Sequence, residues 1–232
     1  MRGVEIIPVE GLPEVRAEDV LAELIVERAT LADGDVVVVT QKVVSKAEGR
    51  MVDLDEGDLA ARRALIESES VRILRRRDEL IVSETRHGFV CANAGIDVSN
   101  VPEGRAALLP VDPDRSARRI RDGIRARAGV EVGVIVSDTF GRAWRVGVTD
   151  VAIGCAGIAA VVDLRGTTDT GGRQLVATEV AVADELASAA ELVMGKSSAV
   201  AVAVVRGIDA TWFRESSVQR EIVRSHREDL FR

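Results

Sequence analysis

The hydrophobic pattern switches repeatedly between two periods along the chain, which predicts a mixture of strands and helices. Apolar or alternating runs predict strands at residues 5–9, 35–40, 79–83, 88–92, 132–137, 175–183 and 199–206. Helical spacing of apolar residues predicts helices at 17–28, 57–77, 112–129 and 184–194, and a helical tail from residue 212. Residues 148–162 are consistent with a further strand. This order predicts a mixed α+β class, while the pattern alone leaves the architecture open.

The length of 232 residues fits one catalytic unit over residues 1–232, either a single domain or two intimately joined subdomains. Hydrophobic residues make up 47% of the chain, which is enough for a sizeable core. No apolar run approaches the ~18 residues that span a bilayer, and no signal-peptide pattern is visible, so we expect a cytoplasmic protein without a membrane partner. The net charge of −7 argues against sequence-independent nucleic-acid binding.

Cysteine and tryptophan suggest packing rather than chemistry. Cys91 and Cys155 match no disulfide or metal-binding spacing, so we expect two small buried hydrophobic residues. Trp144 and Trp212 are likewise expected to be packing residues.

The first motif with candidate chemistry is Thr40-Gln41-Lys42-Val43-Val44-Ser45-Lys46-Ala47-Glu48-Gly49-Arg50, interpreted as a loop after a buried strand. The chain has three lysines, and two of them, Lys42 and Lys46, lie here, whereas the other basic residues are arginine. A lysine ammonium binds phosphate as a compact point charge, so the pair suggests a phosphate contact. A solvated lysine pair is the alternative.

The second motif, residues 93–100 (NAGIDVSN), places short oxygen-bearing side chains around a glycine. Asp97 is a candidate ligand for a hard cation such as Mg²⁺ or Mn²⁺, and Asn100 is a candidate donor to a base or phosphate. Taken alone, the same residues also make a good turn.

The third motif, residues 137–145 (SDTFGRAWR), follows another buried strand. Asp138 and Thr139 form a plausible cation site, and Arg142 and Arg145 are candidate anion contacts, because ligands of open α/β sheets gather at the carboxyl ends of strands. An Asx-type turn with a surface arginine pair is the alternative. Since no G-x-x-x-x-G-K-[ST] motif occurs, a nucleotide would be held by another device than a P-loop.

Seven blocks together resemble one family, the coenzyme F420-0:γ-glutamyl ligases. In order, they are GLPE (11–14), TQKVVSKAEGR (40–50), NAGIDVSN (93–100), LLPVDPD (108–114), SDTFGRAWR (137–145), EVAVADE (179–185) and AVVRG (203–207). The sequence of these blocks is most similar to that of the N-terminal ligase domain of the actinobacterial bifunctional form. We expect no nitroreductase-like domain of the kind that follows it there, and both a stand-alone ligase and a piece of a longer protein remain open.

The resemblance implies an activity, a fold and an assembly. GTP would phosphorylate a carboxylate of the coenzyme precursor, and the amine of L-glutamate would attack the acyl phosphate, with further γ-linked glutamates added in the same way. Mg²⁺ or Mn²⁺ would assist, with K⁺ a further candidate. The implied fold is neither P-loop nor ATP-grasp, and the implied assembly is an intertwined homodimer.

The resemblance also assigns residues. It implies metal ligands at Asp97, Asp138 and Thr139, and GTP contacts at Gly11, Leu12, Pro13, Glu14, Gln41, Lys46 and Asn100. Asp138 and Lys46 are the residues that we expect to be catalytic. The sequence departs from the family at Lys196, where archaeal members carry an acidic residue that helps to bind a metal, and at Gln41, where a small hydroxyl residue is common. A ligase for another carboxylate acceptor and a non-catalytic binding module are the alternatives.

Overall fold

The computed structural model describes residues 3–55, 57–99 and 101–230. Its main sheet has the strand order β1-β12-β2-β8-β9, in which β2 and β8 are parallel and the other neighbours are antiparallel. These strands span Glu5–Pro8 (β1), Val202–Arg206 (β12), Val36–Thr40 (β2), Gly133–Arg142 (β8) and Arg145–Ala156 (β9). The mixed α and β class predicted from the sequence is confirmed.

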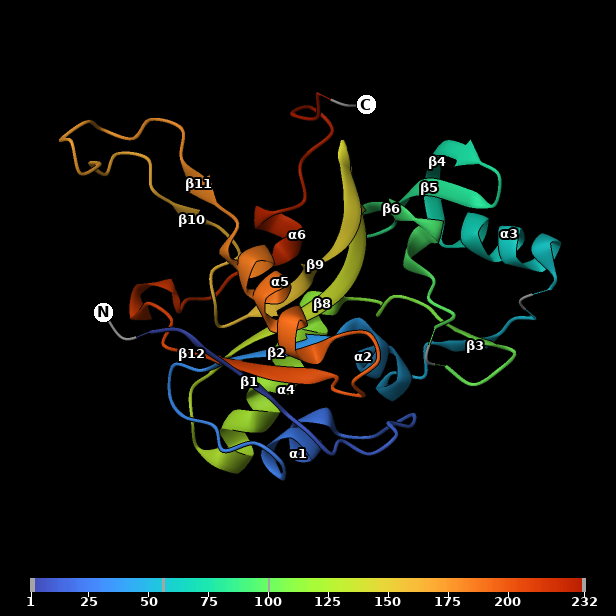
Figure 1. Cartoon of the computed structure of the whole chain (residues 1–232), viewed down its shortest axis with the longest axis horizontal. Helices are drawn as coiled ribbons and strands as arrows, with labels where there is room; N and C mark the ends of the chain where they lie inside the picture. The colour runs from blue at the N-terminus through green and yellow to red at the C-terminus, as the bar shows by residue number, and fades with distance from the viewer. Residues whose placement is uncertain (1–2, 56, 100, 231–232) are drawn as a thin grey trace.

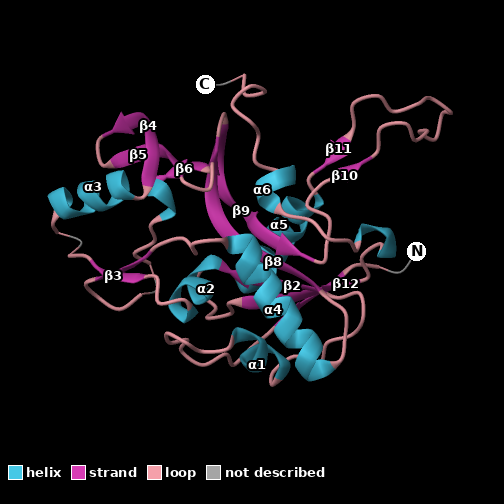
Figure 2. Cartoon of the chain, turned by 180° about the vertical axis from the view of Figure 1, so that it is seen from behind, coloured by secondary structure: helices cyan, strands magenta, loops and turns pink. Residues whose placement is uncertain are grey.

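Helices cover both faces of this sheet (Figures 1 and 2). One face carries α1 (Leu21–Val26) and α4 (Pro113–Ala128), and the other carries α5 (Val182–Met194). Valines fill the centre, since Val36 to Val39 of β2 are fully buried. Gly154 of β9 lets α4 approach the sheet, because a Cβ there would lie 2.3 Å from the carbonyl carbon of Pro113. Such close contact requires glycine.

A second, smaller sheet and its helix lie to one side of the main sheet (Figure 1). A three-stranded sheet contains β4 (Ser70–Arg77), β5 (Leu80–Thr85) and β6 (Val90–Ala92), and packs with α3 (Leu59–Ser68) around Ile66, Ile81 and Ala94. The other elements are α2 (Gln41–Ala47), β3 (Met51–Asp53), η1 (Asn93–Gly95), β7 (Arg105–Ala107), β10 (Val162–Asp163), β11 (Glu179–Val180), η2 (Ala210–Trp212) and α6 (Val218–Glu221).

Helix α4 follows the sequence prediction closely. The Asp112 carboxylate accepts a hydrogen bond from the Arg115 N–H (2.9 Å), Pro113 begins the helix, and Gly129 ends it with φ +69°. Each feature satisfies or replaces an otherwise unpaired backbone group at a helix end. The predicted C-terminal glycine of α5, Gly195, is also confirmed.

The prediction of one long helix over residues 57–77 is wrong. Helix α3 ends at Ser68, and the next residues form β4, which pairs with β5 in an antiparallel hairpin. Asp78, at the turn, has φ +54°, a conformation that a helix cannot contain. Pairing with β5 therefore overrides the helical spacing of the apolar residues.

Other predicted boundaries are also corrected. The 40–50 motif is not a loop, because Gln41–Ala47 form α2. Within 175–183, only Glu179–Val180 are strand, and the helical part of the tail is limited to Val218–Glu221. The predicted helix over 17–28 shortens to Leu21–Val26.

The predicted burial of both cysteines is confirmed, and both are free thiols. Burial raises the pKa of each thiol to about 12, so neither is ionised near neutral pH. Trp212 packs against the core as expected, whereas Trp144, in the turn between β8 and β9, is 89% exposed. No helix in the described ranges is long and apolar enough to cross a membrane.

Candidate active site

The site begins where the two parallel strands end together. Thr40 of β2 is the register partner of Ser137 of β8, so Gln41 and Asp138 follow at the same edge of the sheet. Beyond this point β8 continues with β9 as a hairpin, which extends past the end of β2 (Figure 1). The prediction that the strand ends at Ser137 is wrong, because pairing with β9 carries it to Arg142. Asp138 and Thr139 therefore project from a strand and not from a loop.

Asp97 reaches the site from a strained turn. Asn93, Ala94 and Gly95 have φ values of 51°, 55° and 69°, a left-handed run that is unfavourable for alanine. A Cβ on Gly95 would lie 2.9 Å from the Leu109 side chain, so the turn is packed tightly. The Asp97 backbone then exchanges hydrogen bonds with Ala107 (3.0 and 2.8 Å). These contacts fix the direction of the Asp97 side chain, as expected for strain stored at a functional site.

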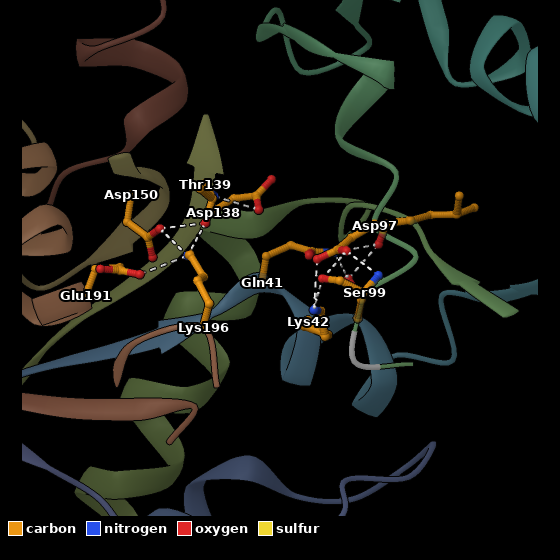
Figure 3. Close-up of polar contacts among 11 residues, drawn as sticks. Gln41, Lys42, Asp97, Ser99, Asp138, Thr139, Asp150, Glu191 and Lys196 are labelled. Carbon is orange, nitrogen blue, oxygen red and sulfur yellow. Dashed lines mark hydrogen bonds and ion pairs between the residues drawn. The ribbon is translucent and has the colours of Figure 1, made fainter. Parts of the chain in front are cut away.

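The Asp97 carboxylate is already paired within the protein. Its Oδ2 lies 2.9 Å from Lys42 Nζ, and its Oδ1 accepts hydrogen bonds from the Ser99 N–H and hydroxyl, both at 2.7 Å. Burial opposes ionisation of Asp97, but the hydrogen bonds from Lys42 and Ser99 outweigh it and lower the pKa. Asp97 is therefore an ionised carboxylate with a lysine counter-ion (Figure 3).

Asp138, in contrast to Asp97, is a carboxyl group without an ion pair in the described part of the chain. Its Oδ1 accepts one hydrogen bond, from the Thr139 N–H (2.8 Å), and no cationic side chain of the described chain forms an ion pair with it. Burial raises the pKa of Asp138 to about 7. The negative charges of Asp97 and Asp150 add to this rise, while the Thr139 N–H and the positive charge of Lys196 offset part of it. Asp97 and Asp138 are thus within electrostatic reach of each other.

A third acid, Asp150 of β9, completes the site and was missed from the sequence. It is 2% exposed, and its Oδ1 accepts hydrogen bonds from the Thr139 hydroxyl (2.6 Å) and from Lys196 Nζ (3.0 Å). The available signal was an aspartate inside the apolar run of residues 148–156. Only the register of the hairpin, in which Asp150 pairs with Thr139, shows that it faces the site.

The candidate nucleotide residues are brought together in part. Lys46 Nζ lies 2.5 Å from Glu14 Oε1, which ties the segment of Gly11, Leu12, Pro13 and Glu14 to α2. Gln41 is 2% exposed, and its side-chain amide donates to Ser45 Oγ (2.7 Å) and the Leu108 carbonyl (2.9 Å). Its N–H groups therefore brace the loop before α4. Asn100 lies outside the described residues.

Arg142 and Arg145 flank the hairpin turn. Both are exposed, and the Arg142 guanidinium donates to the Val146 carbonyl at 3.1 Å. They lie three or more residues beyond Thr139 along the hairpin, so the structure separates them from the three acids.

The residues present fit a hard divalent cation. Carboxylate and hydroxyl oxygens of Asp138, Thr139 and Asp97 are the donors that Mg²⁺ and Mn²⁺ prefer. Within the described residues no group of three or more histidine, cysteine, aspartate or glutamate side chains is placed to hold a metal ion by itself. An open set of this kind suits Mg²⁺, which retains waters and takes substrate phosphates as ligands.

Comparison with known proteins gives the class of the molecule. The family model for F420-0:γ-glutamyl ligase matches residues 11–207, which include all the acids described above. The chain therefore belongs to the F420-0:γ-glutamyl ligase family and is a ligase.

Curated relatives resemble it over nearly their whole length. It is 44% identical over 250 residues to the coenzyme F420:L-glutamate ligase of Methanothermobacter thermautotrophicus, with 99% of both chains covered. It is also 44% identical to the ligases of the same name from Methanopyrus kandleri (252 residues, all of both chains) and Archaeoglobus fulgidus (245 residues, 99% of this chain and 96% of the relative).

Proposed function

We propose that this ligase joins L-glutamate to the coenzyme F420 precursor, and then adds further γ-linked glutamates, at the expense of GTP. The observation that carries the proposal is that Asp138 and Thr139 follow the end of the parallel strand pair, with the Asp97 carboxylate within electrostatic reach of Asp138. Full-length relatives named coenzyme F420:L-glutamate ligase support the choice of substrates.

The proposed reaction has two balanced steps. A carboxylate oxygen of the precursor attacks the γ-phosphorus of GTP, the bond from the γ-phosphorus to the bridging oxygen breaks, and GDP leaves. The glutamate amine then attacks the carbonyl carbon of the acyl phosphate, phosphate leaves, and the nitrogen loses a proton to give the amide. Phosphorylation is needed because a free carboxylate is a poor acyl donor.

The residues of this chain have distinct roles in that scheme. Asp138 and Thr139, with Asp97, would hold Mg²⁺ or Mn²⁺, which neutralises charge between the β- and γ-phosphates. Lys46 and the 11–14 segment would bind the nucleotide, with the Lys46 ammonium as a point charge for phosphate. Lys46 is 9% exposed, so little water screens that charge. K⁺ is a further candidate ion.

We further propose a homodimer that uses the β8–β9 hairpin. Trp144, Val146 and Val148 are 89%, 99% and 62% exposed, an apolar group that monomeric proteins rarely leave in water. Light scattering coupled to size exclusion should give twice the chain mass, and a Trp144→Ser, Val146→Ser variant should give the chain mass. A monomeric parent chain would contradict the dimer.

A mass-spectrometric assay tests the function. Purified protein is given the deazaflavin precursor, L-glutamate and Mn²⁺, with GTP in one sample and ATP in another. The expected result is a mass gain of one or more glutamyl residues and phosphate release, both dependent on GTP. No gain with either nucleotide would overturn the proposal, and turnover only with a different carboxylate would identify a related ligase instead.

A further inference from the structure

Lys196 is a lysine held among oxygen atoms from three separate elements. It follows α5, and its Nζ lies 2.5 Å from Thr139 Oγ1 of β8, 3.0 Å from Asp150 Oδ1 of β9 and 3.2 Å from Glu191 Oε1 of α5 (Figure 3). Two carboxylates and a hydroxyl around one positive centre form the kind of oxygen set that also binds free cations.

The Asp150 carboxylate requires such a positive charge. It is 2% exposed, and a buried carboxylate without a partner is strongly unfavourable. Its other polar partners are hydroxyls, Thr139 Oγ1 at 2.6 Å and Ser137 Oγ at 3.3 Å, which carry no charge. The Lys196 side chain is 57% exposed, so the position of its ammonium is reachable from solvent.

The Thr139 hydroxyl is oriented by the same arrangement. A hydroxyl has one proton to donate and two lone pairs to accept with. The proton goes to Asp150, and one lone pair accepts from Lys196. One lone pair therefore remains, and its direction is fixed by the other two bonds.

From these contacts we infer that the Lys196 ammonium is a resident cation of the active site, occupying a position among Thr139, Asp150 and Glu191 that a free cation would otherwise take. Lys196 is thereby a positioning residue, because it leaves Thr139 one lone pair for the divalent ion at Asp138. The inference rests on the proposed function for the role of that ion, but the occupied position itself follows from the geometry.

Counting bound Mn²⁺ tests this inference without any turnover. The free-ion signal in electron paramagnetic resonance gives the number of ions bound per chain, and calorimetry gives their affinity. Lys196→Met removes the charge while keeping a side chain of similar length, and it should bind one more Mn²⁺ per chain than the parent protein. Lys196→Glu adds a third carboxylate and should bind the additional ion at least about tenfold more tightly than the Met variant.

Two further variants locate the additional ion. Adding Glu191→Gln to Lys196→Met should weaken or remove it, because Glu191 supplies one of the three oxygens. Arg165→Met is the matched control, since Arg165 lies between Asp163 (2.6 Å) and Glu179 (3.1 Å) on the exposed surface, and it should bind no additional ion.

The outcomes separate this inference from the proposed function. An unchanged Mn²⁺ count in Lys196→Met, with melting curves showing a folded protein, would overturn the resident-cation assignment and leave an ordinary ion pair. An equal gain in Arg165→Met would overturn it as well. If the parent binds no Mn²⁺ at Asp138, the proposed metal-dependent function fails, while a gain in the Lys196 variants still supports the occupied position.

Discussion

Asp97 and Asp138 bring the same functional group to one site, but the protein prepares them in opposite ways. Asp97 is paired with Lys42 at 2.9 Å and accepts two bonds from Ser99, and its pKa is lowered. Asp138 has one backbone hydrogen bond and no ion pair within the part of the chain described, and its pKa is raised to about 7.

The difference indicates a division of labour. A carboxylate that is already paired with lysine loses that ion pair when it binds a metal ion. A carboxyl group without an ion pair gains a counter-ion instead, so the cation stabilises its ionised form. We therefore propose Asp138 as the primary point of attachment for a divalent ion, and Asp97 as a secondary one. Asp97 also raises the pKa of Asp138, so the two acids act on one another.

The largest effect should come from removing the unpaired acid. Asp138→Asn should lower turnover by about a thousandfold or more, because it removes the principal charge that holds the ion against the phosphates. Asp97→Asn should lower it by about ten- to a hundredfold, as expected for a secondary ligand that already has a lysine counter-ion. Initial rates of phosphate release at saturating GTP measure both. Equal losses in the two variants would contradict the division of labour.

The second prediction concerns pH. Below pH 7 a proton competes with the metal for Asp138, so the apparent Kd for Mn²⁺ should rise by up to about tenfold per pH unit. Asp97 should add nothing in this range, because its pKa is lowered. Calorimetric titrations from about pH 5 to pH 8 measure the midpoint.

Asp97→Asn provides the matched variant for this titration. It removes a negative charge that raises the pKa of Asp138, so the midpoint should move to lower pH. A Kd that does not change with pH, or a midpoint that does not move in the variant, would show that the two carboxylates do not share a site.

The sequence indicates which residues belong to this site better than it indicates their geometry. Asp97, Asp138, Thr139 and Lys46 stand in contiguous motifs, where short-range composition indicates cation and phosphate binding. Two of the elements around them were also predictable. Strand β2 is an uninterrupted valine run, and helix α4 has its capping residues in place. Local signals of these kinds do not depend on distant parts of the chain.

What could not be predicted depends on pairing between distant segments. Asp150 faces Thr139 because of the β8–β9 register, and that register includes an irregularity between Val136 and Ser137. Strand β4 forms because β5 pairs with it, although its own residues suggest helix. The partners of Lys42 and Lys196 are likewise set by tertiary structure, so the contrast between Asp97 and Asp138 became visible only in the folded chain.

The third prediction is that replacing Asp138 and replacing Asp97 by asparagine change the free energy of unfolding in opposite directions. The unfolded chain releases the Asp138 proton near the ordinary value of 3.8 and the folded chain near 7, so stability falls as the pH rises between these values. Without metal at about pH 8, Asp138→Asn should therefore raise the free energy of unfolding by about 1–2 kcal/mol. Asp97→Asn should lower it by about 1 kcal/mol, because it weakens the Lys42 ion pair and the Ser99 bonds.

Urea unfolding in the presence of a chelator measures these changes. At about pH 4 the gain from Asp138→Asn should largely disappear, because Asp138 is then protonated in the folded chain and the unfolded chain, near its ordinary pKa of 3.8, has given up only part of its proton. A loss of stability in Asp138→Asn at both pH values would mean that the carboxylate already has a cationic partner in the metal-free protein.

The smallest effect should come from Ser99, which supports the paired acid without charge. Ser99→Ala removes the hydroxyl bond to Asp97 Oδ1 (2.7 Å) but leaves the backbone N–H bond of the same length and the Lys42 ion pair. We expect an affinity for Mn²⁺ about two- to fivefold weaker, since one hydrogen bond to a charged group contributes little when two other partners remain. Ser99→Thr keeps the hydroxyl and should behave as the parent does. A loss in Ser99→Ala as large as that in Asp97→Asn would show that the hydroxyl, and not the Lys42 pair, sets the position of this carboxylate.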